Sequence, residues 1–250
     1  MSINLEYNAI VTGAKKGIGY ATVLKLAEQG INVWACARCY DADFEENLEQ
    51  IAKKNNVWIE PIYFDLLDIE EIKKGIKNII SKKKKIDILV NVAGIVYNNS
   101  FFMTPIEKLK EVFEVNYFNQ IFVMQLVGRI MMRQKNGVIV NVTSVSGIEI
   151  TEGKLAYGSS KAAFIYATKA ISKELAQYNI RVNAIAPGLT DTDMNKTISE
   201  EDMEKVIKRS SFKRMATPEE IASAIEFLVS NRSSFMTGQV LVVDGGRLWV

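Results

Sequence analysis

Short runs of apolar, often β-branched residues alternate with longer segments of helical period along almost the whole chain. The short runs are nearly continuously apolar, as expected for strands of a parallel sheet that is covered on both faces. We expect seven strands, at Asn8–Thr12, Asn32–Ala37, Val57–Phe64, Ile86–Val92, Val138–Thr143, Arg181–Ala186 and Val240–Val243. We expect the main helices at Ile18–Gln29, Phe44–Asn55, Ile69–Ser81, Ile106–Arg133, Tyr157–Ala176 and Pro218–Val229. This alternation predicts an α/β fold: a doubly wound seven-stranded parallel sheet with helices on both faces, the Rossmann fold.

Composition narrows the class of protein. The 250 residues contain four prolines and no Ser/Gly-rich linker, so residues 1–250 are interpreted as a single domain. A formal net charge of +2 leaves no basic surplus for a dedicated nucleic-acid binder. The N-terminus lacks the apolar stretch of a signal peptide, and no segment approaches the length of a membrane span. We therefore expect a cytoplasmic protein that binds neither nucleic acid nor membranes.

The chain contains no histidine. This excludes Ser-His-Asp hydrolases, Cys-His proteases and histidine-containing zinc sites, and we expect no metal. Acid–base chemistry must then come from Tyr, Lys, Asp, Glu or Cys. Cys36 and Cys39 have the C-x-x-C spacing of a redox pair, but Cys36 lies inside an apolar run, which favours ordinary reduced thiols.

A glycine-rich turn lies between the first strand and the first helix. It runs from Thr12 to Gly19 as T-G-x-x-x-G-x-G, which is not a Walker loop. Glycines at such a turn let the backbone approach a pyrophosphate, and the helix N-terminus offers free N–H groups. The strand–turn–helix context predicts a dinucleotide site.

The end of the second strand bears on which dinucleotide binds. Ala37 takes the place where an acidic residue would hold the ribose 2′-OH of NADH, and Arg38 follows it. Lys15 and Lys16 lie in the facing loop, so three cations and no carboxylate favour the 2′-phosphate of NADPH. Asp65, after the third strand, is placed either to meet the adenine or simply to form a turn.

Tyr157 and Lys161 lie four residues apart at the start of a predicted helix, on one face. A phenol has a pKa near 10, and a neighbouring ammonium group would lower it towards the working range. Ser144 closes the fifth strand at its carboxyl end, where its hydroxyl can hydrogen-bond a substrate carbonyl. Together with the glycine-rich turn, these residues predict carbonyl reduction.

The sequence resembles the compact, single-domain branch of the short-chain dehydrogenase/reductase family. The resemblance covers nearly the full chain: the turn at Thr12–Gly19, Asn91-Val92-Ala93-Gly94, Asn116, Ser144, Tyr157, Lys161, Pro187-Gly188 and Thr192. It departs from the family at Val92, where Asn is usual. The resemblance implies cofactor contacts at Gly13, Lys15, Lys16, Gly17, Ile18, Gly19, Arg38, Asp65, Leu66, Asn91, Ala93, Gly94, Tyr157, Lys161, Pro187, Gly188, Leu189 and Thr192.

The same resemblance implies roles for the catalytic candidates Asn116, Ser144, Tyr157 and Lys161. Tyr157 would be the general acid, Lys161 would tune it and hold the nicotinamide ribose, and Ser144 would orient the carbonyl. Asn116 would help hold a water relay. Asn91 would tie neighbouring strands together, and Thr192 with the backbone near Leu189 would bind the carboxamide.

Within the family, the sequence is most similar to 3-oxoacyl-[acyl-carrier-protein] reductases, for example in Thr237-Gly238-Gln239-Val240. An acidic carrier protein requires basic residues beside the active-site mouth. Lys135 matches one expected position, whereas Tyr178 stands at the second. We expect a substrate loop at about 193–215, with a short helix near Glu201–Lys208. Apolar residues before Tyr157 either line a substrate pocket or face a neighbouring subunit: Ile148, Ile150 and Leu155.

The main hypothesis is an NADPH-dependent reductase that converts a ketone, foremost a 3-oxoacyl thioester, into a secondary alcohol, with acyl carrier protein as a candidate partner. One alternative keeps the chemistry and takes a sugar or secondary-metabolite ketone. A lesser alternative is a non-catalytic NADP-binding regulatory protein. The resemblance also implies a homotetramer formed through Ile106–Arg133 and Tyr157–Ala176, and the apolar Leu248-Trp249-Val250 is expected at an interface.

Overall fold

A seven-stranded parallel sheet forms the centre of the molecule. The fold is a computed structural model that describes residues 7–195 and 200–246. The strand order is β3-β2-β1-β4-β5-β6-β7, which confirms the predicted doubly wound α/β fold. The strands are β1 (Asn8–Thr12), β2 (Asn32–Ala37), β3 (Ile59–Tyr63), β4 (Ile88–Asn91), β5 (Gly137–Val142), β6 (Ile180–Pro187) and β7 (Val240–Val243).

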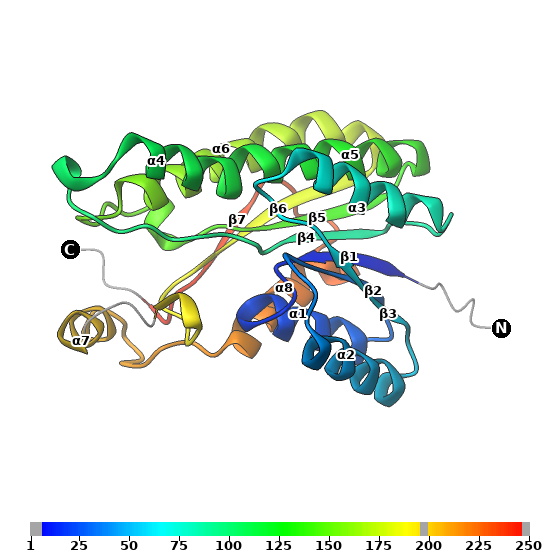
Figure 1. The fold of residues 1–250 in the computed structure, drawn as a ribbon, viewed down its shortest axis with the longest axis horizontal. Coiled ribbons are helices and arrows are strands. Elements are labelled where there is room, and N and C mark those ends of the chain that lie inside the picture. Colours follow the sequence, from blue (N-terminus) through cyan, green and yellow to red (C-terminus); the bar gives the residue numbers. More distant parts are fainter. Residues whose placement is uncertain (1–6, 196–199, 247–250) are drawn as a thin grey trace.

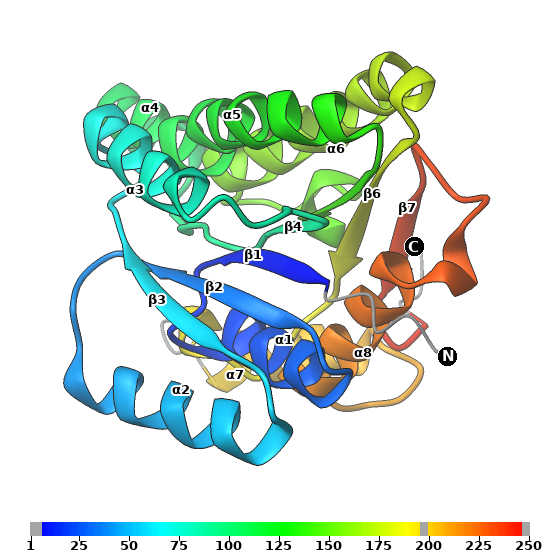
Figure 2. The ribbon, with the colours of Figure 1, turned by 90° about the vertical axis from the view of Figure 1, so that its right-hand side faces the viewer.

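Helices cover both faces of this sheet (Figures 1 and 2). Helices α1 (Gly17–Glu28), α2 (Ala42–Asn55) and α8 (Pro218–Val229) pack on one face, and α3 (Ile69–Ser81), α5 (Asn119–Gln134) and α6 (Leu155–Leu175) pack on the other. Successive strand residues point to opposite faces. Ile10 of β1 therefore joins the core under α3, α5 and α6, whereas Ala9 and Val11 join the core over α1, α2 and α8.

The predicted helix Ile106–Arg133 is continuous but contains a π-turn. It consists of α4 (Ile106–Phe113), a π-helical turn at Glu114–Phe118 and α5. A π-turn adds one residue to the helical repeat, which rotates the following side chains relative to the preceding ones. Here the turn carries Asn116, which is completely buried. The predicted helix is confirmed to within one residue, and the π-turn inside it was not predicted.

Side-chain caps fix where two helices begin. Thr217 and Glu220 form a reciprocal capping box at the start of α8, with Pro218 as the first helical residue, as predicted. At α2, the Asp41 side chain accepts a hydrogen bond from the Phe44 N–H at 2.8 Å. The helix therefore begins at Ala42, two residues before the predicted start.

Both cysteines are free thiols, which confirms the expectation of ordinary reduced cysteines. Cys36 is buried within β2, where desolvation raises its pKa, and Cys39 is exposed. Within the described residues, no helix is long and apolar enough to cross a membrane. The C-terminal Leu248-Trp249-Val250, expected at an interface, lies outside the described residues.

Candidate active site

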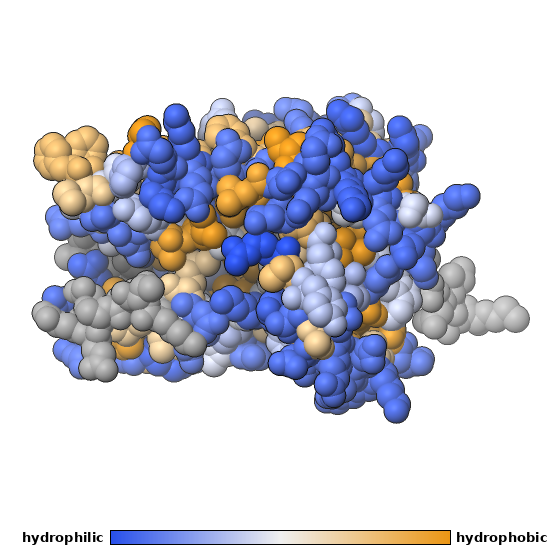
Figure 3. All heavy atoms as spheres, viewed as in Figure 1, coloured by the Kyte–Doolittle hydropathy of each residue, from blue (hydrophilic) through white to orange (hydrophobic). Residues whose placement is uncertain are grey.

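A cleft of about 720 Å³ lies at the carboxyl ends of the strands. Thr12, Ala37, Val142 and Pro187 line it, and each stands at or beside the carboxyl end of its strand. The strand order reverses between β1 and β4, and ligands of doubly wound folds bind at such a switch point. Figure 3 shows this side of the molecule, where apolar side chains reach the surface in the band between the two helical layers.

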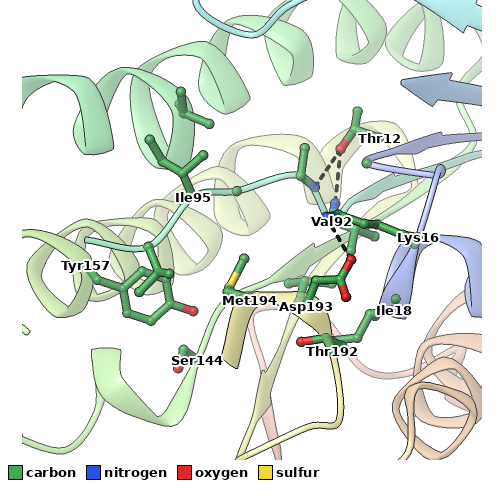
Figure 4. A pocket seen from close by; sticks show the side chains of 18 of the residues that line it. Thr12, Lys16, Ile18, Val92, Ile95, Ser144, Tyr157, Thr192, Asp193 and Met194 are labelled. Atoms are coloured by element: carbon green, nitrogen blue, oxygen red, sulfur yellow. Dashed lines mark hydrogen bonds and ion pairs between the residues drawn. The ribbon is translucent and has the colours of Figure 1, made fainter. Parts of the chain in front are cut away.

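The glycine-rich turn forms one wall of the cleft. Gly13 has a φ of +67°, and a Cβ there would lie 2.9 Å from the backbone of Ala93, so no larger residue fits. The Thr12 Oγ1 accepts hydrogen bonds from the N–H groups of Val92 (3.0 Å) and Ala93 (3.2 Å), which joins the turn to the loop after β4 (Figure 4). Lys16 precedes α1, and its side chain makes no capping hydrogen bond. The first N–H groups of α1 are therefore available to a ligand in the cleft.

The cations expected around the cofactor phosphates have acidic partners. The Lys15 Nζ lies 2.6 Å from Asp41, and the Lys16 Nζ lies 3.0 Å from Asp193. Arg38 is exposed, lines the cleft and pairs with no residue in the described part of the chain. The expectation of three cations without a carboxylate was therefore wrong, because Asp41 and Asp193 are distant in sequence from the lysines that they contact.

Ser144 and Tyr157 lie at the other end of the cleft (Figure 4), and Lys161 lines the cleft beside Tyr157. The tyrosine and the lysine project from the first turns of α6, and Ser144 follows β5. All three side chains are largely buried, and a hydrogen bond joins Tyr157 to Ser144. The Lys161 Nζ lies 5.8 Å from the centre of the Tyr157 ring and donates to the Val142 carbonyl at 2.9 Å.

Burial dominates the protonation of this group. Desolvation raises the pKa of Tyr157, and the hydrogen bond with Ser144 opposes this rise. Desolvation lowers the pKa of Lys161 to about 8. Lys161 is not among the groups that shift the pKa of Tyr157 here, and its ammonium group donates to the Val142 carbonyl, so a tuning role for this lysine stays a prediction.

Two predicted site residues, Asn91 and Asn116, do not line the cleft. Their side chains instead hydrogen-bond a neighbouring strand and the backbone of a loop. The Asn91 Nδ2 donates to the Asn141 Oδ1 at 2.9 Å, so Asn91 ties β4 to β5 as expected. The Asn116 side chain accepts from the Ile95 N–H and donates to the Ile95 carbonyl, both at 2.9 Å. Its Nδ2 also lies 3.1 Å from the Ser160 Oγ. A water relay at Asn116 stays a prediction.

Two neighbours of Asn116 were missed in the sequence. The Asn119 Nδ2 donates to the Leu66 carbonyl at 2.5 Å, and the Gln120 Nε2 donates to the Ala93 carbonyl at 2.8 Å. Asn116, Asn119 and Gln120 are buried, and their amides hold two loops of the cleft, the one after β3 and the one after β4. Three polar side chains at i, i+3 and i+4 on an otherwise apolar helix face were the signal that could have revealed them.

Comparison with known proteins identifies the family. A family model described as enoyl-(acyl carrier protein) reductase matches residues 13–247. The 3-oxoacyl-[acyl-carrier-protein] reductase of Thermotoga maritima is 39% identical over 241 residues, which cover 95% of this chain and 96% of that protein. The chain belongs to the short-chain dehydrogenase/reductase family. It is an oxidoreductase that uses a nicotinamide cofactor and acts on CH–OH and C=O groups.

Solved structures of this family share its fold closely. The 3-oxoacyl-[acyl-carrier protein] reductase of Brucella melitensis superposes with a TM-score of 0.90 at 29% identity, covering 98% of this chain and 92% of that one. YwfH, an NADPH-dependent reductase involved in bacilysin biosynthesis, also superposes with a TM-score of 0.90, at 27% identity and with 97% and 98% coverage.

The cleft of this short-chain dehydrogenase/reductase fits a nicotinamide dinucleotide. Backbone lies where a Cβ on Gly13 would project, and a Cβ on Gly19 would lie 2.1 Å from the Gly13 carbonyl oxygen. These glycines let the turn pack closely against its own backbone and against the loop after β4, at the wall of the cleft. All predicted cofactor-binding and catalytic residues except Asn91 and Asn116 line the cleft.

The substrate end of the cleft contains residues that were not predicted. Lys154 is half-buried, and its Nζ lies 3.3 Å from the Ser146 Oγ; both residues line the cleft near Tyr157. Met194 and Val206, from the predicted substrate loop, line it as well. The predicted apolar candidates behave differently, since none is among the described residues lining the cleft and each is exposed: Ile148, Ile150 and Leu155.

The two positions expected to contact a carrier protein lie far from this mouth. Lys135 ends α5 just before β5, and Tyr178 lies in the turn just before β6. Both therefore stand at the amino ends of the strands, whereas the cleft is at the carboxyl ends. Their turns are neighbours, since the Asn179 Nδ2 lies 3.5 Å from the Asn136 Oδ1. Within one chain, Lys135 cannot border its own active site, and that expectation was wrong.

Proposed function

We propose that this protein is an NADPH-dependent reductase that converts 3-oxoacyl thioesters into 3-hydroxyacyl thioesters. The observation that carries the proposal is the meeting of Ser144, Tyr157 and Lys161 in the cleft that also contains the glycine-rich turn. The names of the Thermotoga and Brucella relatives support the substrate class. Arg38, exposed at the end of β2, supports NADPH over NADH.

Proton transfer in this proposal relies on a phenol. When bound, the nicotinamide supplies the hydride for the carbonyl carbon. The Tyr157 hydroxyl donates its proton to the carbonyl oxygen, and the Ser144 hydroxyl donates a hydrogen bond to the same oxygen as negative charge develops. In reduction Tyr157 must begin the step protonated, and burial, which raises its pKa, keeps the phenol protonated. Lys161, when charged, stabilises the phenolate that remains.

The decisive experiment follows NADPH oxidation with acetoacetyl thioesters of coenzyme A and of acyl carrier protein. Tyr157→Phe should lower kcat at least about a hundredfold, the usual contribution of a general acid, while NADPH affinity changes little. Tyr7→Phe is the matched control, because Tyr7 is exposed beside the amino end of β1, at the opposite end of the strands from the cleft. Unchanged turnover by Tyr157→Phe would refute the mechanism, and no turnover of either thioester would refute the substrate class.

A second substrate class is a secondary-metabolite ketone. The likeness to YwfH supports it, because that reductase serves bacilysin biosynthesis. A polar half-buried residue, Lys154, at the substrate end also suits a ketone that carries an acidic group. Turnover of keto acids but not of thioesters would favour this candidate. A non-catalytic regulatory role would instead require NADPH binding without turnover in a broad ketone screen.

The assembly and partner are part of the same proposal. We expect a homotetramer built through α4–α5 and α6, on which Ile106, Phe118 and Tyr166 are more than half exposed. Phe101, Phe102 and Met103, in the turn shortly before α4, are also more than half exposed. A tetramer would let Lys135 of one subunit approach the cleft of another, as carrier recognition requires. Analytical ultracentrifugation showing only a monomer would refute this assembly. The cytoplasmic location and the substrate loop at 193–215 stay predictions.

A further inference from the structure

The ion pair between Lys15 and Asp41 lies at the corner of the cleft where the adenosine ribose is expected. Lys15 belongs to the glycine-rich turn, and Asp41 lies four residues after the end of β2. Their side chains are 2.6 Å apart, and Lys15 lines the cleft together with Ala37, Arg38 and Cys39. The pair therefore stands beside the position that distinguishes a 2′-phosphate from a 2′-hydroxyl.

The Asp41 carboxylate is held in place from two sides. Its Oδ1 accepts the hydrogen bond from the Phe44 N–H that caps α2, and its Oδ2 contacts the Lys15 Nζ. The partial positive charge at the N-terminus of α2 further favours the ionised carboxylate. Asp41 therefore cannot leave Lys15 without uncapping the helix, whereas the flexible Lys15 side chain can turn towards another anion.

This arrangement reduces the positive charge available to a 2′-phosphate. Arg38 and Lys15 are the cations at the corner, and Asp41 neutralises one of them. The second loop cation, Lys16, is paired with Asp193 at the entrance to the substrate loop. A doubly charged phosphate would gain the attraction of Lys15 but meet the repulsion of Asp41. A neutral 2′-hydroxyl would meet no such repulsion and could donate a hydrogen bond to the carboxylate.

We propose that Asp41 sets the cofactor selectivity of this protein, by competing with the 2′-phosphate for Lys15 and so moderating the preference for NADPH over NADH. The inference rests on the proposed function, because it presupposes that the cleft binds these dinucleotides. Asp41 would then determine specificity as well as cap α2. The two roles can be separated, because a substitution can remove the charge and keep the cap.

The test uses Asp41→Asn in the full-length protein, because asparagine caps a helix as well as aspartate does. We expect the ratio of kcat/KM for NADPH to that for NADH to rise about threefold to tenfold at low salt, and the rise to shrink as salt screens the charges. Glu49→Gln is the control: Glu49 is exposed farther along the same helix and is not among the charges that act on Lys15, so the ratio should stay within about twofold.

A binding measurement separates this inference from the proposed reaction. Titration calorimetry with adenosine 2′,5′-bisphosphate and with adenosine 5′-monophosphate reports on the 2′-phosphate without any turnover. Asp41→Asn should tighten only the bisphosphate, and Asp41→Ser, which also keeps a cap, should do the same. An unchanged or lower NADPH preference, or an equal effect on both nucleotides, would overturn the inference while leaving the proposed reduction intact. If the unmodified protein binds neither nucleotide, the proposed function itself fails and the inference with it.

Discussion

Replacing Lys161 by methionine should make the protein more stable at neutral pH while it loses activity. Lys161 is only 3% exposed, and desolvation lowers its pKa from 10.5 to about 8. Burying this ammonium group lowers the stability of the folded protein. Methionine has a similar length and no charge, so it would remove that cost. The variant therefore separates the demands of stability from those of the proposed chemistry.

The structure gives the size of the effect. The shift in the pKa of Lys161 corresponds to about 3 kcal/mol by which folding disfavours the charged side chain. Methionine also loses the hydrogen bond to the Val142 carbonyl, which costs about 1 kcal/mol. At pH 7 we therefore expect Lys161→Met to raise the free energy of unfolding by about 2 kcal/mol.

The sign of the pH dependence is equally specific. Below pH 8 the lysine is charged in both the folded and the unfolded chain, so the full cost is present. Between pH 8 and 10.5 the folded protein releases the proton before the unfolded chain does, and the unmodified protein gains stability. The advantage of Lys161→Met should therefore shrink over this range and reverse to about −1 kcal/mol above it.

Urea denaturation of both proteins at pH 7, 9 and 10 measures this difference. Lys169→Met is the control, since Lys169 is exposed on the same helix and its replacement should change stability by less than about 0.5 kcal/mol. A Lys161→Met protein that is less stable than the unmodified one at pH 7, by an amount that does not vary with pH, would refute the reasoning.

Two further predictions concern the cleft and the thiols. A Cβ at position 94 would lie 3.1 Å from the Asn116 Oδ1 and 3.5 Å from the Lys161 Nζ, so Gly94→Ala should lower kcat/KM about tenfold or more in steady-state assays. Gly128→Ala, where nothing lies within 4 Å, should keep activity and gain about 0.5–1 kcal/mol in urea denaturation; equal kinetics of the two variants would contradict this account. Titration with an aromatic disulfide should label Cys39 in the native protein and Cys36 only after unfolding, and rapid labelling of both would show that β2 opens readily.

Strands and helices could be predicted from the sequence because they depend on local patterns. The runs at Asn8–Thr12 and Asn32–Ala37 are strands with the predicted bounds. The π-turn at Glu114–Phe118 could not be predicted in this way, because one additional residue hardly alters an apolar periodicity. In the structure the π-turn places the Asn116 amide so that it hydrogen-bonds the backbone N–H and carbonyl of Ile95.

The site residues could be predicted where local sequence position alone determines where the side chain lies. Tyr157, Lys161 and Ser144 follow from helix spacing and from the end of a strand. Charge balance was not predictable, because it depends on residues that are distant in sequence: Asp193 reaches Lys16 only once the fold brings β6 beside the first loop. The same limit applies to Lys135, since the end of the sheet on which a residue lies is a property of the topology.

Asn116, Asn119 and Gln120 have a consequence for the pH range over which the cleft can work. The groups that hold its loops are amides, which neither gain nor lose a proton, and the chain contains no histidine. The frame around the cleft should thus keep its shape across the pH interval in which Lys161 changes charge. For the loops after β3 and β4, the groups that hold the backbone are not the groups that titrate, so the pKa of Lys161 can be tuned by substitution without loss of these amide contacts.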